Sequence, residues 1–135
     1  GYFPPNANRS STVAHEFGHY LSYVGMMSYY KAEQLTFVRT NMASKLLDVN
    51  QDFLNGTYSK MVIQEAYDNY KNNYNGTLGF DEFRASISQY AVARDSKGLY
   101  IYDETIAEAY HDIYLNGDNA KLASKLIFEQ LLTYI

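Results

Sequence analysis

The chain has 135 residues, a length that fits one domain with a single hydrophobic core. Its net charge of -4 gives no general attraction to nucleic-acid phosphates or anionic lipid, and no apolar run approaches the ~20 residues of a membrane-spanning helix. Because the sequence contains no cysteine, any metal ion must be held by histidine and carboxylate side chains. We therefore expect a globular protein with no nucleic-acid and no membrane partner.

Apolar spacing predicts helices in the first half of the chain. A helix is expected after the proline-containing opening, up to about residue 27. Its core face is expected to contain Val13, Phe17, Tyr20, Leu21 and Val24. A second helix is predicted over residues 30–53, with Gly56 just past its end as the C-cap.

The second half of the chain also reads as mostly helical. Further helices are expected over residues 59–71, 80–91, 104–115 and from 119 onward. "LYIY", residues 99–102, is the one stretch that looks extended, and Asp103 after it is placed to cap the next helix. The last helix is expected to turn Leu122, Leu126, Ile127 and Leu131 toward a partner surface. The predicted fold class is therefore mainly α, or α+β at most.

The stretch "TVAHEFGHYLSYVG" in the first helix has the H-E-x-x-H spacing of zinc peptidases. His15 and His19 are one helical turn apart, so both rings can reach one metal ion, and Glu16 projects beside them as a candidate general base. Gly18 in the helix interior costs up to ~1 kcal/mol relative to alanine, which is better explained by close approach of another segment. The alternative is that the three polar residues share a helix by chance.

A catalytic zinc site needs a third protein ligand. The metzincin continuation would require glycine at position 22 and histidine at position 25, but the sequence has Ser22 and Gly25. The later helix "DETIAEAYHDIY" offers Glu104, Glu108 and His111 on one face. We assign Glu104 to the metal and Glu108 to a hydrogen bond with a ligand histidine. His111 as third ligand, and a solvated acidic helix face, remain the alternatives.

"HEFGH" followed by "ETIAEAY" resembles the catalytic domain of the anthrax lethal factor family of zincin metallopeptidases, which includes secreted Pro-Pro endopeptidases. "GYFPP" and "SQYA" are also similar to zincin-like segments of phage and prophage minor head proteins. The matching islands span nearly the whole chain, except for residues 28–85. The resemblance implies a gluzincin-like site with one Zn²⁺ ion.

Residue by residue, the resemblance implies His15, His19 and Glu104 as zinc ligands and Glu16 as the general base. It also implies a tyrosine before the third ligand that donates a hydrogen bond to the oxyanion. Tyr90 in "ISQYA" is the best match. Tyr100 and Tyr102 lie closer to the third ligand in sequence and are the alternatives.

The expected function is that of a zinc-dependent endopeptidase that hydrolyses peptide bonds of a peptide or protein substrate with metal-activated water. Zincin folds usually place a sheet before the H-E-x-x-H helix, but only fourteen residues precede His15 here. We therefore expect residues 1–135 to be one zincin-like, mainly helical domain that belongs to a longer parent protein, secreted or phage-associated. The alternative function is a non-catalytic assembly or binding module of a phage or prophage structural protein, stabilised by zinc.

Overall fold

A computed structural model describes residues 9–34 and 56–135, and this part of the chain is mainly α-helical, as predicted. The helices are α1 (Arg9–Gln34), α3 (Thr57–Asn73), α4 (Phe80–Ala85), α5 (Tyr102–Asn116) and α6 (Leu122–Leu132). Short 3₁₀ turns cover Tyr90–Val92 and Gly117–Asn119. Within the described ranges there is no strand, and the only bridge of strand type pairs Arg94 with Tyr100.

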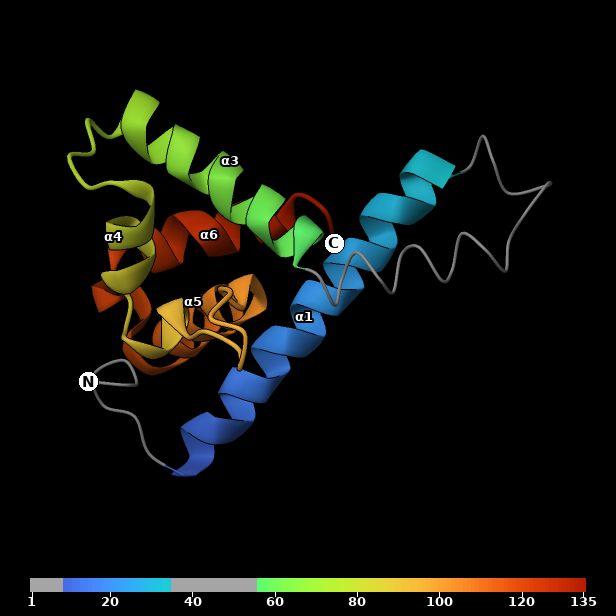
Figure 1. The fold of residues 1–135 in the computed structure, drawn as a ribbon, viewed down its shortest axis with the longest axis horizontal. Helices are drawn as coiled ribbons and strands as arrows, with labels where there is room; N and C mark the ends of the chain where they lie inside the picture. The colour runs from blue at the N-terminus through green and yellow to red at the C-terminus, as the bar shows by residue number, and fades with distance from the viewer. Residues whose placement is uncertain (1–8, 35–55) are drawn as a thin grey trace.

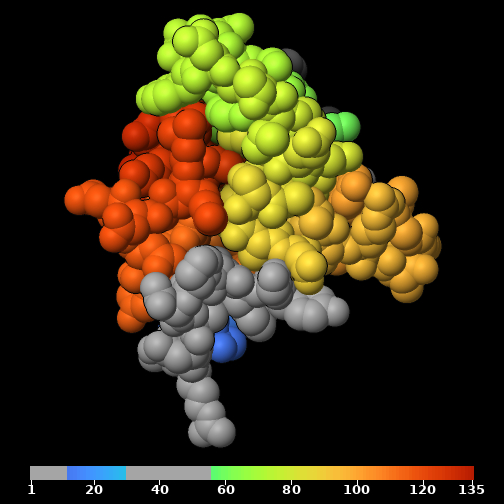
Figure 2. All heavy atoms as spheres, turned by 90° about the vertical axis from the view of Figure 1, so that its left-hand side faces the viewer, coloured from blue at the N-terminus to red at the C-terminus, as the bar shows by residue number. Residues whose placement is uncertain are grey.

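The long helix α1 runs along one side of the other helices, and its C-terminal part extends beyond them (Figure 1). Its main neighbour is α5, which also packs against α6, while α6 packs against α3. The apolar core lies between α3, α5 and α6, and Met26 of α1 reaches into it. The turn between Arg94 and Tyr100 is exposed and projects at the right-hand edge of Figure 2, in orange.

The predicted core face of α1 was wrong for three of its five residues, whereas Leu21 packs against the core and Val24 is half-buried. Val13, Phe17 and Tyr20 are 72%, 44% and 58% exposed. The face of α1 that is buried consists instead of Ala14, His15, Gly18, Ser22, Gly25 and Met26. Most of these side chains are small or polar. The hydrophobic pattern follows the large apolar residues, so it predicted a different side of the helix as the buried one. The histidine side of α1 therefore faces α5.

Gly18 explains how α1 and α5 approach so closely. A Cβ atom at this position would lie 2.8 Å from the Cα of Ala107 and 2.9 Å from its carbonyl oxygen, distances that real side chains do not tolerate. The prediction that close approach of another segment accounts for this glycine is confirmed. The contact brings the histidines of α1 next to the acidic first turns of α5.

Several predicted helix boundaries differ from those in the structure. The first helix does not end near residue 27 but continues to Gln34, because nothing in residues 28–34 breaks the helical pattern. The rest of the predicted helix 30–53 lies outside the described residues. The C-cap role predicted for Gly56 belongs to that helix and is therefore not described either. In the structure Gly56 has φ 74°, in the left-handed region, and is the N-cap of α3, which contains the predicted helix 59–71.

In the second half, the predicted helix 80–91 is divided into α4 and the 3₁₀ turn at Tyr90–Val92. The stretch 99–102 takes part in a single bridge instead of forming a strand. Helix α6 begins at Leu122 rather than at 119, after the second 3₁₀ turn. Leu126, Ile127 and Leu131 are buried as predicted, whereas Leu122 is 41% exposed.

Candidate metal centre

Three side chains from α1 and α5 converge on one point. The Nε2 atoms of His15 and His19 lie 3.2 Å apart. Glu104, in the first turn of α5, places Oε2 2.9 Å from His15 Nε2 and Oε1 3.2 Å from His19 Nε2. The structure thus brings together the three residues that the sequence analysis assigned as metal ligands.

The other nitrogen of each imidazole contacts a carboxylate of α5. His15 Nδ1 lies 2.5 Å from Glu108 Oε2, and His19 Nδ1 bonds to Asp103 Oδ2. A neutral imidazole that donates its proton from Nδ1 carries a lone pair on Nε2, which is the state of a metal-ligating histidine. Both Nε2 lone pairs would then face the carboxylate of Glu104.

The spacing of these atoms fits a small cation. Ligand atoms at about 2.0–2.1 Å from a tetrahedral zinc ion lie about 3.3 Å from one another, close to the observed 2.9–3.2 Å. When the His15 ring is neutral and carries its proton on Nδ1, none of the described residues donates a hydrogen bond to the buried Oε2 of Glu104. Two lone pairs and a carboxylate repel one another unless protons or a metal ion supply positive charge between them. Two imidazoles and one carboxylate are also a ligand set that zinc uses.

The electrostatics of the cluster favour positive charge. Burial lowers the pKa of His15, but hydrogen bonds and charges from Glu104 and Glu108 outweigh it and raise this pKa to about 9. Burial likewise lowers the pKa of His19, and Asp103 and Glu104 together raise it to about 10. For Glu104, burial raises the pKa, yet both histidines bring it down to about 2. The metal-free cluster therefore holds protons, which a metal ion would have to displace.

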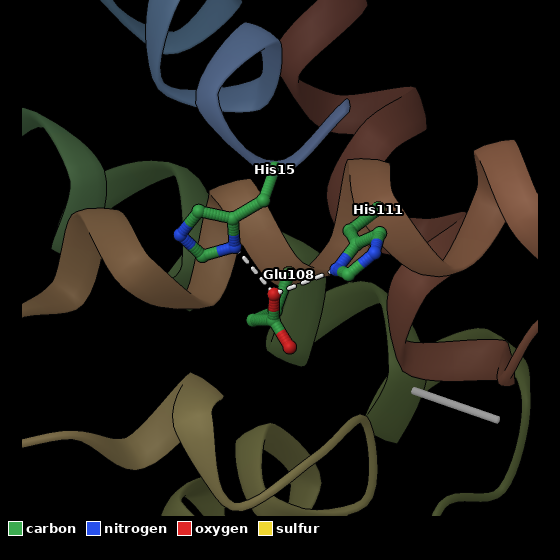
Figure 3. Close-up of side chains that lie close together, drawn as sticks. All are labelled: His15, Glu108 and His111. Carbon is green, nitrogen blue, oxygen red and sulfur yellow. Dashed lines mark hydrogen bonds and ion pairs between the residues drawn. The ribbon is translucent and has the colours of Figure 1, made fainter. Parts of the chain in front are cut away.

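Glu108 is the centre of a buried hydrogen-bond cluster (Figure 3). Its Oε2 contacts His15 Nδ1 and, at 3.0 Å, His111 Nδ1, while its Oε1 accepts a hydrogen bond of 2.8 Å from Ser88 Oγ. This is the contact with a ligand histidine that the sequence analysis assigned to Glu108. His15, Glu108 and His111 also form a group of possible metal ligands. However, the 2.5 Å between His15 Nδ1 and Glu108 Oε2 is a hydrogen-bond distance that leaves no room for an ion.

Asp103 is a site residue that the sequence analysis missed. It was expected to cap the helix, but it lies inside α5, whose N-cap is Ile101, and no side chain makes a capping bond there. Its Oδ1 accepts hydrogen bonds from Ser22 Oγ at 2.5 Å and Ser59 Oγ at 2.9 Å. An acidic residue at the start of a helix is typical of a cap, which explains the prediction. The only signal in the sequence for a role at the metal centre was its position directly before Glu104.

Glu16 lies on the exposed side of the centre. Its side chain is exposed, and one of its carboxylate oxygens is within 4.8 Å of ring nitrogens of His15 and His19. The Nδ1 atoms of the two rings bond to Glu108 and Asp103 and not to Glu16. The position is suitable for a base that acts on a molecule bound at the metal.

Tyr90 is the tyrosine that lies against the cluster. Its ring centroid is 5.2 Å from that of His15, with the two planes at 78°. The negative charge of Glu104, followed by partial burial and the charges of Glu108 and Glu16, raises the pKa of the Tyr90 phenol. The hydroxyl therefore stays neutral at ordinary pH and keeps its proton for donation.

The two alternative tyrosines belong to a different cluster. The rings of Tyr100 and Tyr102 lie over the guanidinium of Arg84, with centroids 4.3 Å and 4.6 Å from its Cζ atom. Arg84 is fully buried and bonds to Thr105 Oγ1 at 3.1 Å. The described contacts thus place Tyr90, and neither alternative, against a candidate ligand ring.

Comparisons with known proteins find no match for this chain, whether with family models, curated sequences or solved structures. Within residues 9–34 and 56–135, no helix combines the length and the apolar character needed to cross a membrane.

Proposed function

We propose that the chain is a zinc-dependent endopeptidase domain, with His15, His19 and Glu104 as the metal ligands. The observation that carries this proposal is the convergence of His15 Nε2, His19 Nε2 and the Glu104 carboxylate within 3.2 Å of one another, with Glu16 beside them. Both Nδ1 atoms are bonded to carboxylates, so only the Nε2 atoms are available to a metal ion. The same bonds fix the orientation of the two rings.

The exposure of the cluster supports a catalytic site over a purely structural one. The side chains of His19 and Glu104 are 24% and 17% exposed, whereas those of His15 and Glu108 are 5% and 0% exposed. The cluster is therefore closed on one side and accessible on the other. Structural zinc sites are usually closed by four protein ligands, while catalytic sites keep one position for water or substrate.

A zinc ion bound there would supply Lewis acidity, which acidifies water and polarises a peptide carbonyl. Glu16 would accept the proton of the attacking water and pass it to the nitrogen of the leaving amine. An exposed carboxylate next to the ligand histidines suits this role, since it reaches the open side without competing for the Nδ1 protons.

Tyr90 would donate a hydrogen bond to the oxyanion that develops from the carbonyl oxygen of the scissile peptide. Two observations support this role: its ring packs against His15, and neighbouring carboxylates keep its phenol neutral. The substrate class that follows from these residues is a peptide or protein.

Glu16→Gln tests the catalytic proposal against the alternative of a zinc-stabilised assembly module. The change keeps the size of the side chain and removes the base, so we expect unchanged zinc content and loss of peptide hydrolysis. Hydrolysis by the variant at the wild-type rate would contradict the proposed role of Glu16. If the wild type retains zinc and cleaves no member of a diverse peptide library, the assembly module becomes the better account.

A further inference from the structure

The carboxylate of Asp103 connects three helices. It lies on α5, bonds to His19 Nδ1 of α1 through Oδ2, and accepts hydrogen bonds at Oδ1 from Ser22 of α1 and Ser59 of α3. Helix α3 contributes none of the three proposed ligands. Ser59 is nevertheless only two hydrogen bonds away from a ligand imidazole.

The two hydrogen bonds to Oδ1 of Asp103 are shielded from water. Ser22 and Ser59 are 0% exposed, and Asp103 is 8% exposed. A carboxylate in such an environment needs its hydrogen-bond donors, because water cannot replace them. With two hydroxyl groups on Oδ1, the plane of the carboxylate is fixed and Oδ2 stays directed at His19.

We propose that Ser59 is a positioning residue of the metal centre, which acts through Asp103 to hold the His19 ring in its metal-binding orientation. The inference rests on the metal site proposed above and does not require peptidase activity. It also gives α3 a role at the centre, since the first turn of this helix supplies the hydroxyl group.

A second hydrogen-bond chain in the same centre has the same chemistry. His15 Nδ1 bonds to Glu108, and Glu108 Oε1 accepts a hydrogen bond of 2.8 Å from Ser88, which is also buried. Each proposed ligand histidine is thus backed by a carboxylate of α5 and by a serine from a segment that supplies no proposed ligand. The repetition argues that the serines serve the centre and do not merely fill space.

The contact predicts thermodynamic coupling between the metal and α3. If Ser59 helps to hold His19 for the metal, then the bound metal must stabilise the position of Ser59 by the same free energy. Binding of Zn²⁺ should therefore slow hydrogen exchange of the backbone amides near Ser59. This expectation needs no mutation to test.

The chain offers a matched control for Ser59→Ala. Ser124 is also 0% exposed, and its hydroxyl donates at 2.6 Å to Asp112, another buried carboxylate of α5. Asp112 makes no described contact with His15, His19 or Glu104. Ser59→Ala and Ser124→Ala remove the same group from the same kind of bond, but only the first one is connected to the proposed metal centre.

The experiment measures Zn²⁺ affinity by competition with a chelator, and the visible absorption of the Co²⁺-loaded protein, for wild type and both variants. We expect Ser59→Ala to weaken Zn²⁺ binding by about tenfold and to shift the Co²⁺ bands, as changes behind a metal ligand do. Ser22→Ala should shift the same bands, since Ser22 donates to the same oxygen. Ser124→Ala should lower the melting temperature without changing either metal readout.

Equal Zn²⁺ affinity and identical Co²⁺ spectra for wild type and Ser59→Ala would overturn this role of Ser59 while leaving the metal site intact. Equal losses in Ser59→Ala and Ser124→Ala would also overturn it, because they would indicate general destabilisation. Should Ser59→Ala fail to fold, unchanged hydrogen exchange near Ser59 on addition of Zn²⁺ to the wild type would count against the proposal. A wild-type protein that retains no metal would contradict the centre itself, and this role with it.

Discussion

His15 and His19 of α1 direct their Nε2 atoms at each other across 3.2 Å, while their Nδ1 atoms bond to two different carboxylates of α5. Packing alone is a poor explanation for this arrangement. Holding each imidazole in place requires the burial of a carboxylate, which is unfavourable by itself. The proposed metal site would account for the arrangement, since a metal ion needs two lone pairs directed at one point.

Glu104→Ala should abolish tight zinc binding. The change removes the only proposed ligand from α5 and leaves two histidines, which are too few for a stable site. Zinc content after dialysis, measured by atomic absorption, is the readout. Glu129→Ala on the exposed side of α6 is the matched control and should retain the metal. Retention of zinc by Glu104→Ala at the wild-type level would show that another residue is the third ligand.

Zinc binding should release protons at neutral pH. The pKa values of His15 and His19 are raised to about 9 and about 10 in the metal-free protein, so both rings are protonated at pH 7. Because a metal needs the deprotonated ring nitrogen, each zinc ion should displace about two protons. Calorimetry in two buffers of different ionisation enthalpy measures this number. Binding heats that do not depend on the buffer would contradict the expectation.

The stability of the metal-free protein should also depend on pH. The folded-state pKa values of both histidines lie above the ordinary value of 6.5, so their contribution to stability is complete below pH 6.5 and is lost as the pH rises through 9 and 10. The pKa of Glu104 is lowered to about 2, so its contribution is lost as the pH falls from 4.5 toward 2. Chemical denaturation of the metal-free protein should therefore show decreasing stability between pH 7 and 10, and His19→Gln should reduce this decrease. A flat profile over this range would be inconsistent with these ion pairs.

Gly18→Ala should destabilise the protein, although alanine is the better helix former. At an exposed helical site the substitution would stabilise by up to about 1 kcal/mol, but here the new methyl group meets the backbone of Ala107 at 2.8 Å. Overpacking of this kind costs about 1–3 kcal/mol, measured as the free energy of unfolding in urea. Ser28→Ala on the exposed side of α1 is the control and should change stability little. An increase in stability for Gly18→Ala would mean that the two helices are not in close contact.

The sequence contained enough information to predict three of the converging residues. His15 and His19 were predicted from the H-E-x-x-H spacing on a helix. Glu104 was chosen from three residues on one face of a later helix, and the resemblance to the lethal factor family implies the same ligand. Gly18 was also interpreted correctly, because a glycine inside a helix has a cost that only a close neighbour explains.

The remainder could not be predicted for physical reasons. Hydrophobic periodicity assigns the apolar side of a helix to the core, yet α1 turns Val13 and Phe17 outward because its contact with α5 is formed by small residues and histidine. The sequence predicts Asp103 as a helix cap, but the carboxylate bonds to His19 instead, and a carboxylate in this position is suitable for either role. Ser59 is 44 residues distant from its partner Asp103, and such a pairing depends on the tertiary packing of α3.

The most direct test of the account is the zinc content of the purified wild-type chain, measured by mass spectrometry of the metal after dialysis against metal-free buffer. The convergence of His15, His19 and Glu104 predicts one equivalent of zinc per chain, removable with a strong chelator and restored by adding Zn²⁺. A chain that is folded and holds no zinc before or after this addition would contradict the metal centre and the proposed function that depends on it.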